Sequence, residues 1–251
     1  MIDIHCHILP HLDDGTTDMD EALNMAKQAV SQGVHTIIAT PHHRDGKYNN
    51  DSSKIVQAVN ELNNQLLIHK IPLTILPGQE IRLYDDLLED LEAGNISKLA
   101  SSRYLLIEFP SSYVPQQYEY LFHELILMNF VPIVAHPERN TELLENEDLL
   151  VSMIEMGALI QVTSASVSGK LGRKIQKKSQ KWCKNGWVHF LASDAHNCKS
   201  RPFDLEEGYK AIHSAIGGDY VHYLQVNADK LINNEIIGKS EVRVKKKFFI
   251  W

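Results

Sequence analysis

Near its start the chain reads Ile2-Asp3-Ile4-His5-Cys6-His7, a short β-rich run that ends in two histidines. Five later apolar runs also lead into histidine, aspartate or glutamate: residues 36–39 into His42 and His43, 73–76 into Glu80, 104–107 into Glu108, 131–135 into His136, and 189–192 into Asp194 and His196. A parallel α/β barrel builds its active site at the carboxyl ends of its strands. Because mixed imidazoles and carboxylates suit Zn, Mn or Fe, the pattern predicts a polynuclear metal site.

Strand and helix signals alternate along the chain, which is typical of a parallel sheet with helices outside it. A seventh strand is expected at 158–162, and Asp18 with Glu21 indicates a capping box at the start of the first helix. Helices are expected near residues 18–33, 53–69, 85–93, 116–128, 147–156, 174–184, 205–215 and 227–233. We therefore expect one α/β domain over 1–251, a (β/α)7 TIM-like barrel, with 234–251 as a C-terminal tail.

The composition is that of an ordinary globular protein, with 43% hydrophobic and 23% charged residues. A formal net charge of -7 argues against nucleic acid as the main partner, because phosphate backbones attract basic surfaces. No apolar run reaches the roughly 18 residues that a membrane helix needs, so no integral membrane segment is expected. The N-terminus lacks a secretory signal and the three cysteines are scattered, so we expect a cytoplasmic protein.

The spacing of the candidate ligands favours a shared site. Side chains along a strand alternate with a period of two, so His5 and His7 point the same way, as do Asp194 and His196. These two pairs follow the first and last strands, which can meet in a closed barrel. Buried charges at this density would be very costly without a metal ion. The other members of the constellation are His42, Glu80, Glu108 and His136.

The two glutamates leave an alternative open. Glu80 and Glu108 could each pair with a nearby arginine, and Arg82 and Arg139 are available for such pairs. We favour metal ligation by both, because two metal ions about 3.5–4 Å apart form the usual clamp for phosphoryl chemistry and a carboxylate can bridge them.

The loop after the first strand offers one more carboxylate ligand. Either Asp13 or Asp14 could ligate while the other serves the turn, and we favour Asp14. His43 neighbours a ligand and is expected to support one, whereas nothing in the sequence places His11 at the site. Six further histidines are expected to be structural or exposed: His35, His69, His123, His189, His213 and His222.

Two arginines predict a phosphorylated substrate. Arg139 and Arg201 follow His136 and His196 in loops at strand ends, and arginine gives planar, bidentate contacts to phosphate. The alternative for each is a surface salt bridge. A cysteine-based phosphatase is excluded, since none of the three cysteines has an arginine six positions later, and no nucleotide-binding loop or nucleophile elbow is present.

Two basic segments each have two interpretations. The helix expected near 174–184 carries Arg173 and five lysines over 173–184, which indicates a solvated face or a docking face for an acidic phosphoprotein. The basic-aromatic run 242–251 is either an extended or frayed terminus, which we favour, or a contact with a partner or membrane surface.

Six motifs together carry a family resemblance: His5-x-His7, Thr40-Pro41-His42-His43, Gly78-Gln79-Glu80, Ile107-Glu108-Phe109-Pro110, Ala135-His136-Pro137-Glu138-Arg139-Asn140 and Ser193-Asp194-Ala195-His196-Asn197. The chain resembles the polymerase and histidinol phosphatase (PHP) superfamily. More closely, it is similar to the bacterial tyrosine-protein phosphatases of the CpsB/CapC type. The resemblance extends from residue 1 to about 233.

The resemblance implies a distorted seven-unit barrel, the PHP fold, with a three-metal centre that is usually manganese-dependent. Fe or Zn would also accept these ligands. The implied ligands are His5, His7, Asp14, His42, Glu80, Glu108, His136, Asp194 and His196. Arg139 and Arg201 would bind phosphate. Family members dephosphorylate the tyrosine-rich tail of a bacterial tyrosine kinase that controls capsule or exopolysaccharide synthesis.

We therefore expect a metal-dependent protein-tyrosine phosphatase in which a metal-activated hydroxide attacks phosphorus in line, without a covalent phosphoenzyme. The first alternative is the same centre acting on a small phosphomonoester such as histidinol phosphate. Phosphodiester cleavage and a non-catalytic regulator that keeps a metal-stabilised fold are further alternatives. Removal of the metal distinguishes the regulator, because it would lose only stability.

Overall fold

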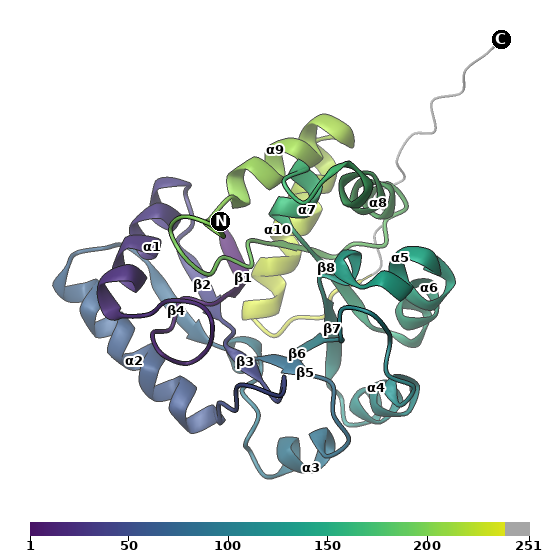
Figure 1. The fold of residues 1–251 in the computed structure, drawn as a ribbon, viewed down its shortest axis with the longest axis horizontal. Coiled ribbons are helices and arrows are strands. Elements are labelled where there is room, and N and C mark those ends of the chain that lie inside the picture. Colours follow the sequence, from purple (N-terminus) through teal and green to yellow (C-terminus); the bar gives the residue numbers. More distant parts are fainter. Residues whose placement is uncertain (239–251) are drawn as a thin grey trace.

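The computed structural model describes residues 1–238, so positions 239–251 of the expected tail lie outside the described residues. Parallel strands form two sheets with helices packed around them (Figure 1). The smaller sheet has the order β1 (Ile2–Cys6), β2 (Thr36–Ala39), β4 (Thr74–Pro77). The larger has the order β3 (His42–His43), β5 (Glu80–Arg82), β6 (Tyr104–Glu108), β7 (Val131–Ala135), β8 (Leu159–Thr163), β9 (Phe190–Ala192). The predicted α/β class with parallel strands is confirmed.

Two of the seven expected strands are each followed by a second short strand that was not expected, which gives nine strands among the described residues. Between β2 and β3 the chain passes through Pro41, which has no N–H to give to a sheet. Between β4 and β5 it passes through Gly78, where a Cβ would lie 2.6 Å from the Ile38 side chain. The larger sheet therefore begins at His42 and Glu80, which are paired in register.

The first and last strands are neighbours. Asp194 donates its backbone N–H to the carbonyl oxygen of His5 at 2.9 Å. The backbone N–H of His7 in turn donates to the carbonyl oxygen of Ala195, also at 2.9 Å. These bonds place the chain after β9 beside the end of β1, so the two predicted ligand pairs of the first and last strands lie side by side.

Seven expected helices occupy their predicted ranges to within a few residues: α1 (Met19–Ser31), α2 (Ser52–Ile68), α3 (Leu87–Glu92), α4 (Tyr118–Leu127), α6 (Glu147–Met156), α8 (Arg173–Lys184) and α9 (Leu205–Ala215). Additional short elements are α5 (Thr141–Glu145), α7 (Ser164–Ser168), η1 (Leu99–Ser101) and η2 (Pro137–Arg139). Asp18 caps α1 by accepting from the N–H of Glu21 at 2.8 Å. The Glu21 carboxylate, however, accepts from the N–H of Thr17, so the reciprocal half of the expected box is shifted by one residue.

The last helix is longer than expected. We predicted a short helix over 227–233, but α10 runs over Gly218–Ile232. Two consecutive glycines at 217 and 218 usually indicate that a helix does not form there, but α10 begins at the second of them. Its buried residues Tyr220, Leu224, Ala228 and Leu231 follow helical spacing, and the last two join an inner apolar cluster with Ile2 of β1.

The main core lies between the strands and the surrounding helices, and a smaller apolar cluster is formed by the side chains that the strands share with α10. Burial on both faces explains why most strands are almost continuously apolar. Across positions 1–238, no helix combines the length and the hydropathy needed to cross a membrane.

Candidate metal centre

The nine predicted ligands lie close together at the carboxyl ends of the strands. Ligand atoms form three overlapping groups, each within 4.8 Å: His7, Asp14, His42 and His196; His5, His7, Glu80 and Asp194; His42, Glu80 and Glu108. His136 adjoins these groups, because its Nε2 lies 2.7 Å from Glu80 Oε1 and 3.9 Å from Glu108 Oε1. The structure thus brings together residues that are up to 191 positions apart in the chain, from His5 to His196.

Three imidazoles are oriented by acceptors behind them. The Nδ1 of His7 lies 2.7 Å from the Asp13 carboxylate, and the Nδ1 of His196 lies 3.0 Å from a backbone carbonyl oxygen. The Nδ1 of His5 lies 3.0 Å from the side-chain oxygen of Gln161. Because these oxygens only accept, each ring donates from Nδ1 and turns the lone pair of Nε2 toward the centre. Hydrogen bonds of this kind fix the ligating nitrogen of metal-bound histidines.

The two aspartates of the first loop have different positions. Asp14 Oδ1 lies 3.5 Å from the Nε2 of His42 and 3.4 Å from the Nε2 of His196, so it faces the same space as these imidazoles. Asp13 lies behind the site, where it accepts from His7 and from the backbone N–H groups of His42 and Gly15. This geometry favours Asp14 as the ligand and Asp13 as a positioning residue.

Replacement of Asp13 by asparagine is expected to weaken metal affinity by about 10–100-fold, the usual effect of losing a partner behind a metal ligand. All three groups around Asp13 are donors, so an amide NH₂ would face one of them without an acceptor. A competitive metal chelator measures the dissociation constants of both proteins. Equal affinities would show that Asp13 does not position His7.

The ligand atoms of the centre also fit metal ions because most of them have few hydrogen-bond partners within the protein. The Nε2 atoms of His5 and His7 lie 3.2 Å apart with both lone pairs directed inward, an arrangement that a cation between them would stabilise. Besides Glu108 Oε2, which pairs with Arg82, four buried ligand atoms find no hydrogen-bond partner within residues 1–238: His42 Nδ1, Glu80 Oε2, Asp194 Oδ1 and His196 Nε2. Buried polar atoms are almost always satisfied, so such a concentration fits a site for metal ions.

The pKa values of the clustered carboxylates and imidazoles also fit a site for metal ions. Burial and the neighbouring Glu80 carboxylate raise the pKa of Glu108 to about 8, so positive charge is needed to keep both carboxylates ionised at neutral pH. Burial and the Arg139 guanidinium lower the pKa of His136 to about 4, which keeps this imidazole in its neutral, ligating form. Against the effect of burial, His5 and two arginines hold the pKa of Asp194 well below its usual range.

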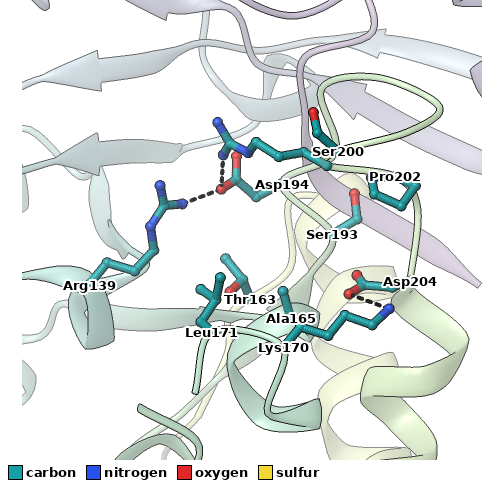
Figure 2. A pocket seen from close by; sticks show the side chains of 11 residues that line it. Arg139, Thr163, Ala165, Lys170, Leu171, Ser193, Asp194, Ser200, Pro202 and Asp204 are labelled. Atoms are coloured by element: carbon teal, nitrogen blue, oxygen red, sulfur yellow. Dashed lines mark hydrogen bonds and ion pairs between the residues drawn. The ribbon is translucent and has the colours of Figure 1, made fainter. Parts of the chain in front are cut away.

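Both predicted phosphate-binding arginines reach the edge of the centre. Arg139 Nη1 donates to Asp194 Oδ2 (Figure 2), and Arg201 Nη2 donates to the same oxygen at 2.6 Å. Their side chains are 37% and 36% exposed, so each guanidinium keeps N–H groups open to an incoming anion. The arginine pairing that the sequence left open for the glutamates is present for Glu108, because Arg82 Nη2 lies 2.8 Å from Glu108 Oε2. Within residues 1–238, Glu80 forms its ion pairs with histidines only.

Several residues that support the centre were not expected from the sequence. Gln161 lies in β8, the strand without a predicted ligand, and a polar residue within a buried strand was the available signal. Asp3 is fully buried and accepts from the backbone N–H and hydroxyl of Ser193, which joins β1 to the segment after β9. A charged residue inside the first apolar run was its signal.

Other expectations had mixed outcomes. His43 was expected to support a ligand, but it is buried beside Tyr84 and makes no hydrogen bond to the described side chains. His189 is structural, since it is buried and accepts from the N–H of Ile160. On the basic helix α8, Lys178 and Lys181 both pair with Glu147. These pairs favour a solvated helix face over a docking face for that part of α8. The other five histidines expected to be structural or exposed are exposed: His35, His69, His123, His213 and His222.

Comparisons with known proteins agree over nearly the whole described chain. A family model described as "Capsular polysaccharide synthesis, CpsB/CapC" matches residues 1–233. The tyrosine-protein phosphatase YwqE of Bacillus subtilis is 44% identical over 237 residues, which are 94% of this chain and 93% of that protein.

Solved structures give the same result for the fold. A crystal structure from work on YwqE of Bacillus subtilis and CpsB of Streptococcus pneumoniae, described as unique metal-dependent tyrosine phosphatases, matches with a TM-score of 0.93 at 43% identity. The match covers 96% of this chain and 97% of that one. A TatD-family hydrolase from Entamoeba histolytica matches with a TM-score of 0.52 at 11% identity over 95% and 98% of the two chains, which shows a shared fold alone.

Proposed function

The chain belongs to the CpsB/CapC family, and from this premise we propose that it is a metal-dependent protein-tyrosine phosphatase. The observation that carries the proposal is the juxtaposition of a buried imidazole–carboxylate cluster with two partly exposed arginines on one carboxylate, Asp194. Such a site combines ligands for metal ions with cationic donors for a phosphoryl group.

We assign all nine clustered side chains as metal ligands: His5, His7, Asp14, His42, Glu80, Glu108, His136, Asp194 and His196. Three overlapping groups of ligand atoms support three metal ions, which we propose to be Mn²⁺. We further propose that the strands form a distorted seven-unit barrel in one domain, since β1 bonds to the segment after β9. The proposed location is the cytoplasm, and the proposed partner is the tyrosine-rich tail of a bacterial kinase that controls capsule synthesis.

The chain's own residues have distinct tasks in hydrolysis. When bound, the metal ions supply Lewis acidity and a water with a pKa lowered to near 7. Arg139 and Arg201 hold the equatorial oxygens of the phosphoryl group and stabilise the negative charge that grows there. Asp194 keeps both guanidiniums at the edge of the centre. Because a tyrosyl leaving group has a pKa of about 10, it departs without the full protonation that an alkoxide requires.

The alternative substrate, a small phosphomonoester such as histidinol phosphate, is not favoured. It would use the same centre and the same arginines, so the geometry of the ligands does not distinguish the two. The relatives at 44% and 32% identity are both named as tyrosine-protein phosphatases, and this naming supports the protein substrate.

The test compares phosphate release from a phosphotyrosine peptide and from histidinol phosphate, each with added Mn²⁺ and with a chelator. We expect a higher kcat/KM for the peptide and loss of release from both substrates after chelation, because the ions supply the attacking water. Preference for histidinol phosphate would overturn the substrate, and release that persists without metal would overturn the mechanism.

A further inference from the structure

A pocket of about 310 Å³ adjoins the two arginines on one side of Asp194. Arg139 and Asp194 lie at one end of it (Figure 2), together with Arg201. The rest of the wall comes from the end of β8, from α7 and the loop that follows it, and from the segments after β9 and before α9. The arginines contact Asp194 Oδ2, whereas Asp194 Oδ1 lies 3.4 and 3.3 Å from the Nε2 atoms of His5 and His7. The metal centre and the pocket therefore lie on the two sides of one carboxylate.

The wall of this pocket contains an exposed leucine, Leu171, that belongs to neither of the two apolar clusters of the core. Gly169 and Gly172 both have positive φ values, 95° and 94°, and the N–H of Gly172 donates to the carbonyl oxygen of Gly169 at 3.0 Å. This tight turn presents Lys170 and Leu171 at its tip. Leu171 is 42% exposed yet lines the pocket, where Ala165 is a further apolar neighbour.

The lysine at the polar end of the pocket is already paired with carboxylates. Lys170 Nζ lies 3.3 Å from Asp204 Oδ2 and 2.7 Å from Glu207 Oε2, so its charge is matched within the protein. The free cationic N–H groups at the opposite end belong to the arginines. A ligand with one anionic end and one uncharged apolar end is therefore the best match for this pocket.

We propose that this pocket is the subsite for the phenyl ring of phosphotyrosine, with Leu171 as the side chain that selects an aromatic group. The proposal rests on the function proposed above. A phosphoryl group bound by Arg139 and Arg201 would carry its ester substituent into the space that these two arginines line, and that space is the pocket. Its volume is at the small end of the range for ligand sites, about 300–1,000 Å³, as a single side chain requires.

The partial exposure of the lining residues agrees with a substrate that is part of a protein. Lys170 is 44% exposed and the two arginines are more than one-third exposed, so the ring can enter while the main chain of the substrate stays outside. A fully enclosed pocket would exclude a residue attached to a polypeptide.

The test measures binding of three phosphoryl ligands to the metal-loaded protein by calorimetry: phenylphosphonate, methylphosphonate and inorganic phosphate. Leu171→Ser is expected to weaken phenylphosphonate binding, and to raise KM for a phosphotyrosine peptide, by roughly five- to tenfold, because an apolar contact with the ring is lost. Binding of methylphosphonate and phosphate should be unchanged. Leu127→Ser makes the same change at an exposed leucine of α4 and should alter none of these values.

A second variant tests the volume of the pocket. Ala165→Leu fills part of the space next to Leu171 and should also remove the advantage of phenyl over methyl phosphonate. The subsite is overturned if wild-type protein binds both phosphonates equally, if Leu171→Ser binds phenylphosphonate like wild type, or if it loses phosphate binding equally. A phenyl advantage that depends on Leu171, without turnover of any phosphotyrosine peptide, would instead refute the proposed function and leave the subsite in place.

Discussion

Replacement of Glu80 by glutamine is expected to lower kcat by at least about 10³-fold and to remove bound metal from the centre. Glu80 is fully buried, and its two oxygens lie between four imidazoles. Oε2 is 3.2 Å from the Nε2 atoms of His5 and His7 and 3.1 Å from His42 Nδ1, while Oε1 is 2.7 Å from His136 Nε2. Glutamine keeps the shape but loses the charge, and its NH₂ cannot ligate a cation.

The measurement pairs elemental analysis of bound metal with phosphatase rates at saturating substrate. Glu138→Gln provides the matched control for metal content, because Glu138 is equally buried but accepts from Thr163 rather than facing the imidazoles. It should retain the wild-type metal content. A Glu80→Gln protein that keeps all of its metal and most of its rate would remove Glu80 from the ligand set.

That the proposed ligands lie together could be predicted because the fold places them by a local rule. Each ligand except Asp14 ends or closely follows an apolar run, and parallel strands bring their carboxyl ends to one edge. His42 and Glu80 show the rule most directly, since they are paired in register although 38 positions apart. The strand expected at 158–162, which is β8, also has the apolar pattern of a buried strand. It contributes Gln161, which contacts His5, and no proposed metal ligand.

The residues behind the ligands could not be predicted in the same way. Gln161 contacts His5 across 156 positions, and Asp3 contacts Ser193 across 190. Such contacts depend on which strands become neighbours and on side-chain orientation, neither of which a single sequence records. The choice between Asp13 and Asp14 also needed coordinates, because adjacent carboxylates in a loop have no periodicity that tells which one turns inward.

The pocket beside the arginines was likewise not visible in the sequence. Its wall is made by the short helix α7 and the turn that follows it, and neither was expected. A five-residue helix lacks the apolar repeat on which helix prediction depends, and Gly169 with Gly172 indicates only that the chain turns. Leu171 and Arg139 line the same pocket because α7 packs against α9 and β8, and these contacts are not recorded in the sequence.

Simultaneous replacement of Arg139 and Arg201 by alanine is expected to lower kcat/KM for a phosphotyrosine peptide by roughly 10³-fold. Removal of one donor to a developing anion typically costs 10²–10³ in rate. Both guanidiniums contact the same oxygen, Asp194 Oδ2, and both would contact the same phosphoryl group. Their effects are therefore expected to be less than multiplicative, because residues that act as a unit are not independent. Single and double variants assayed together measure this coupling.

Metal content decides how such a loss is interpreted. Asp194 is a proposed ligand, and removal of both arginines takes away the positive charge that keeps its pKa low. If the arginines served only to orient Asp194, the double variant would lose metal and rate together. We expect instead that metal content stays close to wild type, because His5 and His7 still face Asp194 Oδ1. Affinity for inorganic phosphate should fall while the metal remains, and unchanged phosphate affinity would exclude both arginines from the phosphate site.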